Sequence, residues 1–475
     1  MTTEETSAIL QELVTLLGSG RCLTDEDSCN HFGRDWTRFA TPNPAAVLLP
    51  ESIAEVQQII QLARRFNTPI VPSGGRTGLS GGAVAANGEL VLALDRLNRI
   101  VDVDPTSRSI TCEAGAITAQ IQEAAKSIGL HYPVDFASSG SSQIGGNIAT
   151  NAGGIQVIRY GMTRNWVSGL KVVTGTGELL TLNRGLLKNN TGLDFRHLMI
   201  GSEGILGIIV EATLQLCSPP TDTAVLVLGV KSMGAIMSLL QRLQGQADLL
   251  AFEFFSHLAL EKLIAQQGLR APFDGASPFY VLAEYERQGE HSDRELEAIV
   301  EQVMAAGEAD DAVVSQTIAQ AKSLWQLREN ISETIARWTP YKNDISATVS
   351  KVPELLVKIG EVVEQRYPDF EVVWYGHIGD GNLHLNILKP DSMAPEEFET
   401  KCKSVSEELF KIVDGCGGSV SAEHGVGLLK KEFLHYSRSK EEIALMKSIK
   451  RLFDPDLILN PGKVVDMDTA GRGDS

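Results

Sequence analysis

Residues 72–82 read PSGGRTGLSGG and follow directly on a short apolar run, Thr68–Val71, that predicts a β-strand. Five of these eleven residues are glycine. Because glycine adopts positive φ and lets the backbone approach a ligand closely, successive N–H groups of such a loop can converge on an anion such as a pyrophosphate. Thr77 and Ser80 can add hydroxyl donors. The segment therefore predicts a strand followed by a loop that binds a phosphate-containing ligand.

Two further glycine clusters repeat this chemistry, at Ser138–Gly154 (SSGSSQIGGNIATNAGG) and at Gly201–Gly207 (GSEGILG). Strand-like runs flank each cluster, which favours a built ligand site over the alternative of mobile glycine loops. The chain has no G-x-G-x-x-G that opens a helix and no G-x-x-x-x-G-K-[ST]. The sequence thus predicts a cofactor with phosphates that loops hold, in place of a single helix N-terminus.

Length, charge and cysteine content narrow the class of protein. The 475 residues are too many for one hydrophobic core and fit two or three domains. A net charge of −18, from 42 basic and 60 acidic residues, repels nucleic acid and anionic lipid. No apolar run approaches the roughly 18–20 residues that span a bilayer, and the acidic N-terminus has no apolar signal segment. The six cysteines form no C-x-x-C pair, so we expect a cytoplasmic enzyme with reduced thiols.

The spacing of apolar residues predicts two α+β regions on either side of a linker at Pro219-Pro220. Helices are expected at residues 1–20, Ser52–Phe66 (with Ser52 as N-cap), Ala235–Leu243, Asp293–Ala306 and Val314–Trp338. Strands are expected at Leu90–Leu94, Ser109–Glu113, Leu170–Thr174, Leu179–Leu182, Leu206–Leu216 and Phe279–Glu284. The pattern alone gives residues 452–464 no place in either region, and the last dozen residues are expected to form a polar tail.

A group of histidines in the C-terminal half suggests a metal site. The segment from Trp374 to Asn386 reads as strand, glycine turn, strand, so the turn would bring His377 and His384 together. Period-2 alternation places His384 and Asn386 on one face. Later, a glycine-flanked loop presents Glu423 and His424 side by side. Two imidazoles and a carboxylate are the ligand set of a catalytic divalent cation, although hydrogen-bonded histidines of a β core and a solvated loop acid are the alternative.

A cluster of cations lies upstream of the histidines. Arg328 and Ser332 are four residues apart in a helical pattern and would share one helical face. Arg328 offers a planar fork for a carboxylate, and Lys342 offers a second positive charge. An exposed helix with routine charges is the alternative reading. The pattern alone does not decide between the exposed helix and a site for an anionic substrate.

At this point the sequence resembles a known family, the vanillyl-alcohol oxidase type of FAD-binding enzymes with a PCMH-type FAD domain. That family combines P-x-G-G-x-T, G-G-x-x-A-T-N-A-G-G and G-S-E-G-x-L-G-I, which stand here in order within residues 72–82, 145–154 and 201–208. The resemblance extends over essentially the whole chain and implies an α+β fold. It implies an N-terminal helical segment (1–41), a two-subdomain FAD-binding domain (42–220), an α+β substrate or cap domain with the metal site (221–430), and a C-terminal segment (431–475) that returns to the FAD domain.

The resemblance also implies which residues bind FAD. Some relatives attach FAD covalently through a histidine in or near the glycine loops, but these loops contain none here, so non-covalent FAD is expected. The positions carried over are Pro72, Gly74, Gly75, Arg76, Thr77, Gly78, Leu79, Ser80, Pro133, Gly140, Ser141, Ile144, Gly145, Gly146, Asn147, Ala149, Thr150, Asn151, Gly153, Gly154, Tyr160, Gly161, Glu203, Gly204, Gly207, Ile208 and Asn460.

H-x-G-D-G-N-L-H with S-x-x-E-H-G-x-G is similar to the metal-dependent branch of the family, which contains D-lactate, glycolate and D-2-hydroxyglutarate dehydrogenases. The resemblance implies that His377, His384 and Glu423 ligate a divalent metal, with Zn²⁺ first and Mn²⁺ or Fe²⁺ as alternatives. It implies that His424 binds substrate and accepts the hydroxyl proton and that Asn386 contacts the substrate near C1. These roles fit the chemistry of imidazole and of a Lewis acid beside a flavin.

L-R-E-x-I-[ST] followed by Y-K-x-D-[IL]-S is most similar to the D-2-hydroxyglutarate dehydrogenases, in which the Arg, Ser/Thr and Lys hold the second carboxylate. The chain departs from that pattern at Asn343 and at Ala347-Thr348, which leaves close dicarboxylates such as D-malate open. A D-lactate dehydrogenase, a glycolate-oxidising subunit, an oxygen-using oxidase and a non-catalytic carrier of flavin or metal are the alternatives. The resemblance implies electron-transferring flavoprotein as the electron acceptor, and a homodimer is one of the oligomeric states left open.

Overall fold

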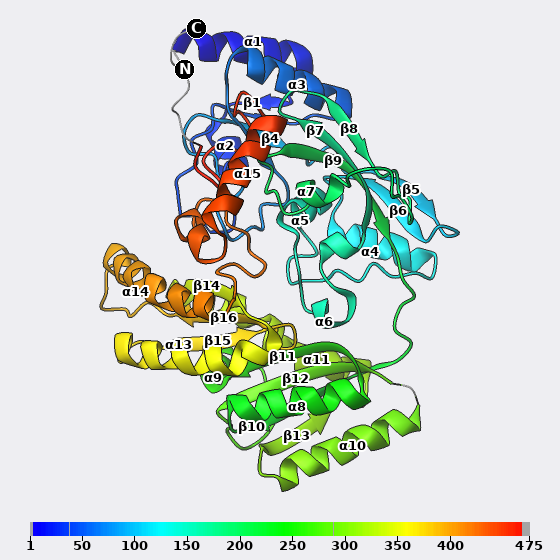
Figure 1. Ribbon diagram of the computed structural model, residues 1–475, viewed down its shortest axis with the longest axis vertical. Helices are drawn as coiled ribbons and strands as arrows, with labels where there is room; N and C mark the ends of the chain where they lie inside the picture. The colour runs from blue at the N-terminus through cyan, green and yellow to red at the C-terminus, as the bar shows by residue number, and fades with distance from the viewer. Residues whose placement is uncertain (1–2, 38, 288, 468–475) are drawn as a thin grey trace. The chain divides into compact units, whose positions relative to one another are not determined.

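The computed structural model describes residues 3–37, 39–287 and 289–467, and the chain divides into two compact units (Figure 1). The first unit comprises Met1–Gly154, Met162–Pro219 and Glu423–Ser475, and the second comprises Ile155–Gly161 and Pro220–Ala422. Both units mix helices and strands, so the expected α+β class is confirmed. The expected polar tail falls mostly on residues 468–475, which lie outside the described part of the chain.

A small sheet with the strand order β1-β2-β4-β3 forms one part of the first unit. Its elements are α1 (Thr3–Leu17), β1 (Cys22–Leu23), α2 (Glu26–Phe32), β2 (Ala46–Leu48), α3 (Ile53–Arg65), β3 (Ile70–Ser73) and β4 (Leu90–Ala93). β4 pairs in parallel with both β2 and β3, and α3 provides the crossover between those two. The predicted N-cap is confirmed, because the Ser52 hydroxyl accepts a hydrogen bond from the Glu55 N–H at 3.2 Å.

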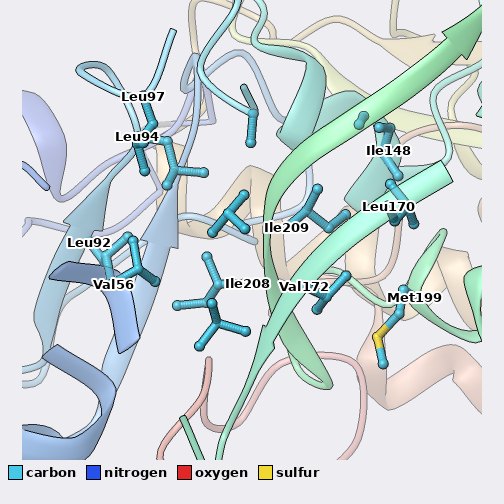
Figure 2. Packing of buried hydrophobic residues seen from close by; sticks show 14 of the residues in the cluster. Val56, Leu92, Leu94, Leu97, Ile148, Leu170, Val172, Met199, Ile208 and Ile209 are labelled. Atoms are coloured by element: carbon cyan, nitrogen blue, oxygen red, sulfur yellow. The ribbon is translucent and has the colours of Figure 1, made fainter. Parts of the chain in front are cut away.

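An antiparallel sheet with the order β5-β6-β9-β7-β8 forms the other part of the first unit. Its elements are β5 (Ile100–Asp104), β6 (Ser109–Glu113), α4 (Thr118–Ser127), α5 (Ile144–Thr150), η1 (Thr163–Asn165), β7 (Val167–Thr174), β8 (Leu179–Leu182), α7 (Arg196–Met199) and β9 (Gly207–Gln215). One hydrophobic core joins the two parts. Figure 2 shows Val56 of α3 and Leu92 of β4 in the same cluster as Val172 of β7 and Ile208 of β9.

The C-terminal segment extends the edge of β3. After η4 (Lys431–Tyr436) and α15 (Lys440–Phe453), Leu459 forms a parallel bridge with Ile70. Lys450, which is 3% exposed, donates to the carbonyl oxygens of Ile205 and Leu459, both at 2.7 Å, and pairs with Asp454. A buried ammonium keeps its charge only with such partners, so this ion pair fixes a segment that the sequence pattern could not place.

The second unit is built on one antiparallel sheet with the strand order β13-β10-β12-β11-β15-β16-β14. Its strands are β10 (Thr223–Val230), β11 (Asp248–Ser256), β12 (Phe279–Glu286), β13 (Ala309–Val314), β14 (Tyr341–Ser346), β15 (Val372–Gly376) and β16 (Asn382–Ile387). Its helices are α6 (Val157–Tyr160), α8 (Met233–Gln246), α9 (His257–Gln267), α10 (Glu290–Ala305), α11 (Ile318–Glu329), α12 (Ile331–Ile335), η2 (Ala336–Trp338), η3 (Val349–Lys351), α13 (Val352–Arg366) and α14 (Pro395–Gly415).

Residues of α9, α11 and α12 cover one face of this sheet. Their apolar side chains pack with Ala251 and Phe255 of β11 and with Val373 and Tyr375 of β15. Since side chains alternate along a strand, Glu253 projects from the same face as its neighbours two residues away. The cross-strand pairs Tyr375–His384 and Lys342–Asn386 continue this face across β16 and β14. We call this side of the sheet the histidine face.

Two sequence predictions about secondary structure were wrong. Val314–Trp338 is not one helix: Val314 ends β13, and Asn330 separates α11 from α12, so Arg328 and Ser332 do not share a continuous helix. The second glycine cluster is not a loop throughout, because Ile144–Thr150 forms α5. Ile144 and Ile148 are fully buried in the core, and their packing overrides the low helix propensity of the glycines between them.

In the part of the chain that is described, none of the helices is both long and apolar enough to cross a lipid bilayer.

Candidate functional site

The three glycine clusters of the first unit meet at one pocket. Twenty-two residues line it: Pro72, Gly74, Gly75, Arg76, Thr77, Gly78, Ser80, Gly82, Ala83, Leu94, Gln143, Gly145, Gly146, Asn147, Ala149, Thr150, Glu203, Gly204, Gly207, Ile208, Ile209 and Asn460. Two of the glycines are required by close approach of the backbone. A Cβ atom at Gly75 would lie 2.3 Å from the Ser141 carbonyl oxygen, and one at Gly145 would lie 2.7 Å from the Ala114 Cβ. Only glycine lets these segments pack this closely.

The pocket contains most of the residues that the resemblance implied, and it adds some. Gly82, Ala83, Leu94, Gln143 and Ile209 line it but were not predicted. Gly82 had a signal in the sequence, because it ends the first glycine cluster. Gln143 lies within the second cluster but was assigned no role, and Ala83, Leu94 and Ile209 lie outside the clusters without a glycine or hydroxyl group to mark them. The implied residues that do not line the pocket are Leu79, Pro133, Gly140, Ser141, Ile144, Asn151, Gly153 and Gly154, together with Tyr160 and Gly161 of the second unit.

Two buried oxygen atoms on the pocket wall fit a ligand with N–H or O–H donors. The side-chain oxygens Oε1 of Gln143 and Oδ1 of Asn460 have no hydrogen-bond partner among the described residues. Asn460 is held in place because its Nδ2 donates to the carbonyl oxygens of Gly82 (3.0 Å) and Glu203 (2.7 Å). An unpaired buried oxygen is costly unless a ligand satisfies it. The hydroxyl and amino groups of a flavin dinucleotide supply such donors, so the pocket fits FAD.

Glu203 connects this pocket to the loop that follows Glu423 and His424. Its carboxylate accepts hydrogen bonds from the backbone N–H groups of Val426 (2.8 Å) and Gly427 (2.9 Å). Burial raises the pKa of Glu203 above its usual value, although the two N–H donors favour the carboxylate. A Cβ at Gly425 would lie 2.9 Å from the Glu203 carboxyl carbon, so the loop seats against this side chain. Sequence reasoning placed Glu203 in the cofactor site but did not foresee this link.

On the histidine face of the second unit, the predicted hairpin brings His377 and His384 together, with ring centroids 5.4 Å apart. Each imidazole has its Nδ1 beside a buried carboxylate: His377 Nδ1 lies 2.8 Å from Glu253 Oε1, and His384 Nδ1 lies 3.6 Å from Asp344 Oδ1. Histidines that bind metals typically have a carboxylate at the other ring nitrogen. The donor set therefore fits a cation at the Nε2 atoms.

The predicted cations lie on the same face. Lys342 Nζ donates to the Ser332 hydroxyl at 3.1 Å, and in the described part of the chain it meets no carboxylate. Burial lowers the pKa of Lys342 below its usual value because no negative charge compensates the ammonium. Arg328 is 5% exposed, and its Nη2 lies 2.8 Å from Oε2 of Glu253. The structure thus places one buried and one partly buried cation beside the histidine pair, and among the described residues no carboxylate pairs with Lys342.

Asn386 also belongs to this group. It is 1% exposed and is the cross-strand partner of Lys342. Its Nδ2 donates weakly to the carbonyl oxygens of His384 and Val373, while its Oδ1 has no hydrogen-bond partner within residues 3–37, 39–287 and 289–467. A substrate hydroxyl could satisfy that oxygen.

Glu423 and His424 are the first residues of the segment that returns to the first unit. His424 Nε2 lies 3.8 Å from Glu423 Oε1, and both side chains are about one-fifth exposed or less. Just before them, Ser419 bridges to Ser346 of β14, and the Ala422 N–H donates to the Asp344 carbonyl oxygen at 3.3 Å. The chain therefore leaves the second unit at Ala422, which is hydrogen bonded to Asp344, and continues directly into Glu423.

Sequence reasoning missed Glu253 and Asp344, the carboxylates at the two histidines. Glu253 is the one charged residue within an otherwise apolar stretch, Leu249–Phe255. A lone carboxylate in a buried strand needs a partner, and this was the available signal. Asp344 lies in the Y-K-x-D-[IL]-S stretch but was assigned no role.

A glycine-lined pocket in an α+β unit, combined with a separate sheet domain that carries histidines and cations, defines a class of two-part flavoproteins. A family model described as "FAD binding domain" matches residues 44–183, and one described as "FAD linked oxidases, C-terminal domain" matches residues 219–464. The chain belongs to the FAD-linked oxidase family. The family resemblance inferred from the motifs is thereby confirmed.

Proteins of nearly the same length share much of the sequence. D-2-hydroxyglutarate dehydrogenase from Stutzerimonas stutzeri (strain A1501) is 54% identical, with 96% of this chain and 98% of that protein covered. D-2-hydroxyglutarate dehydrogenase from Xanthomonas citri pv. viticola is 52% identical, with 96% of each chain covered. The crystal structure of p-cresol methylhydroxylase with substrate bound superposes with a TM-score of 0.77 over 98% of each chain. At 16% identity, that likeness shows the fold alone.

Gly75→Ala is expected to weaken FAD binding by about 1–3 kcal/mol, because its Cβ would clash with the Ser141 backbone and force the two segments apart. The measurement is a titration of apoprotein with FAD, followed by flavin fluorescence. Gly20→Ala is the control, because a Cβ there meets nothing within 4 Å. Equal FAD affinity in the two variants would show that the close approach at Gly75 does not shape the pocket.

Proposed function

We propose that this protein is an FAD- and metal-dependent dehydrogenase that oxidises D-2-hydroxyglutarate to 2-oxoglutarate. The observation that carries the proposal is the pairing, on one sheet face, of a histidine pair with the buried Arg328 and the partly buried Lys342. A 2-hydroxy dicarboxylate has a hydroxyl group that would lie at the histidine pair and a distal carboxylate that would pair with the cations. The names of the two bacterial relatives support the same substrate.

The distal carboxylate is assigned to Lys342, Arg328 and Ser332. Lys342 is a partly buried ammonium that meets no carboxylate among residues 3–37, 39–287 and 289–467, so a substrate carboxylate would supply the missing charge. Arg328 adds donors, because its Nε has no hydrogen-bond partner among the described residues. Ser332 already accepts from Lys342 and orients the ammonium. A substrate with a single carboxylate would leave one of these charges uncompensated.

The metal is assigned to His377, His384 and Glu423, with Zn²⁺ as the first choice and Mn²⁺ or Fe²⁺ as alternatives. The carboxylates at both Nδ1 atoms support this assignment. Ala422, the residue before Glu423, donates a hydrogen bond to the carbonyl oxygen of Asp344, and Asp344 is the cross-strand partner of His384. When bound, the metal supplies a Lewis acid for the substrate hydroxyl, and FAD supplies the acceptor for the hydride from C2.

His424 is assigned as the base. Its imidazole would accept the hydroxyl proton of the substrate, and Glu423, 3.8 Å from its Nε2, would favour the imidazolium that forms. Asn386 would orient the substrate near C1 through its unpaired Oδ1. The products of this step are a ketone, a protonated His424 and a two-electron-reduced flavin, so atoms and electrons balance.

Further parts of the proposal rest on the same residues. FAD would be held without a covalent bond, since no histidine, cysteine or tyrosine is found among the described residues that line the pocket. D-Malate remains a second substrate of the same class. The D-lactate and glycolate alternatives lack the carboxylate that Lys342 requires. Electron-transferring flavoprotein as acceptor, a cytoplasmic location and a homodimer remain predictions.

Anaerobic addition of D-2-hydroxyglutarate should bleach the flavin absorbance of the purified holoprotein, because hydride transfer reduces the flavin. The L enantiomer and D-lactate provide the comparison. Bleaching by D-lactate or glycolate with no response to D-2-hydroxyglutarate would favour the monocarboxylate alternatives. No bleaching by any of a panel of hydroxy acids would contradict the proposed activity.

Lys342→Met should lower kcat/KM for D-2-hydroxyglutarate, because the substrate carboxylate loses its partner. The expected loss corresponds to about 2–5 kcal/mol of transition-state stabilisation. D-Lactate oxidation should hardly change. In the unaltered protein, kcat/KM for the dicarboxylate should fall as pH rises through the lowered pKa of Lys342, because only the ammonium attracts the carboxylate. The exposed Lys358→Met is the control. Equal losses on both substrates would show that Lys342 does not bind the distal carboxylate.

Chelator treatment should remove turnover while the FAD absorbance stays, because the proposed metal ligands and the FAD pocket are separate sets of residues. Zn²⁺ or Mn²⁺ should restore the rate. Metal content and activity are measured on the same samples before and after dialysis. Full activity at negligible metal content would contradict the proposed role of the metal as a Lewis acid.

A further inference from the structure

Glu253 is a buried carboxylate whose two oxygen atoms contact two different functional groups. It lies on β11, and its side chain is 1% exposed. Oε1 lies 2.8 Å from Nδ1 of His377, and Oε2 lies 2.8 Å from Nη2 of Arg328. The Arg328 contact is an ion pair without good hydrogen-bond geometry, since neither Nη2 nor Oε2 has a hydrogen-bond partner in the described part of the chain. One side chain therefore bridges a histidine and a cation of the site.

Tyr375 provides a second connection between the same groups. The Arg328 guanidinium lies 4.7 Å from the centroid of the Tyr375 ring, a cation–π contact. The Tyr375 ring in turn lies 5.0 Å from the ring of His384. Arg328 is thus connected to His377 through Glu253 and to His384 through Tyr375. These contacts hold the cation and the histidine pair in a fixed relation.

We propose that Glu253 is a positioning residue that orients His377 for the metal and Arg328 for the distal carboxylate of the substrate. The inference deepens the function proposed above and rests on it. A carboxylate at Nδ1 stabilises the tautomer with hydrogen on Nδ1, which leaves the Nε2 lone pair for a metal. The same carboxylate compensates the charge of Arg328, so the guanidinium can stay buried before substrate arrives.

The arrangement also bears on substrate length. Glu253 lies within a β-sheet, so the metal-binding histidine and the arginine are set at a fixed spacing by one rigid element. A dicarboxylate can bind at both the metal and Arg328 only when its length matches this spacing. Glu253 should therefore matter more for D-2-hydroxyglutarate than for D-lactate, which uses only the metal end.

The test compares Glu253→Gln with Glu284→Gln in the full-length holoprotein. Glu284 is a suitable control because it lies opposite Ala251 on the same face of the sheet, burial raises its pKa, and its hydrogen bonds go to Gln156, Thr223 and Trp325. Zn²⁺ affinity is measured by competition with a chromophoric chelator in the absence of substrate. The expected result is a 10- to 100-fold loss for Glu253→Gln and no change for Glu284→Gln.

The substrate readout uses the same variants. kcat/KM should fall for both substrates in Glu253→Gln, and at least several-fold more for D-2-hydroxyglutarate than for D-lactate. Unchanged Zn²⁺ affinity and an unchanged substrate ratio would overturn the proposal, even if the melting temperature falls. Absence of hydroxy-acid oxidation by the unaltered protein would instead contradict the proposed function, while the Zn²⁺ comparison would still decide whether Glu253 positions His377.

A second pair of variants covers the case in which Glu253→Gln does not fold. Arg328→Met alone keeps the Glu253–His377 contact, whereas Arg328→Met with Glu253→Leu removes it and leaves no unpaired charge in the buried ion pair. The single variant should retain Zn²⁺ affinity, and the double variant should lose it. Equal Zn²⁺ affinity in the two proteins would show that Glu253 does not position the histidine.

Discussion

The approach of two backbone segments at Gly75 is the constraint on which the first unit depends. The Gly75 Cα faces the Ser141 carbonyl so closely that no side chain fits between them. This contact brings the loop after β3 against the start of α5 and turns two separate glycine clusters into the walls of one pocket. The C-terminal segment then closes the third side with Asn460, which Ile70, Gly82 and Glu203 hold by hydrogen bonds. Binding of FAD is therefore a property of packing between segments that are distant in the sequence.

Charge in a low-dielectric environment organises the second unit in a comparable way. Its histidine face is largely apolar where α9, α11 and α12 cover it and polar at β16 and β14. A buried charge is costly without a partner, and most charges here have one: Glu253 with Arg328, and Lys450 with Asp454 in the first unit. Lys342 is the exception in this group, because no carboxylate in the described part of the chain pairs with its ammonium.

The sequence predicted the local features well and the tertiary partners poorly. The N-cap at Ser52 and the hairpin that joins His377 to His384 depend on neighbouring residues, and both predictions were confirmed. The single helix at Val314–Trp338 was wrong, because apolar residues at helical spacing do not reveal that Asn330 ends one helix and begins the next. The helix within the second glycine cluster was missed because its stability comes from buried Ile144 and Ile148.

The sequence by itself determined the class of cofactor and the family. Glycine loops and a strand–turn–strand pattern depend on residues that are close together in the sequence, so they can be predicted without a structure. Only the tertiary structure decided what each side chain faces. Glu253 is 124 positions before His377, and Glu203 is 224 positions before Gly427. A carboxylate in a strand looks the same in the sequence whether it meets water, an arginine or a histidine, because its environment is set by which strands and loops pack against it.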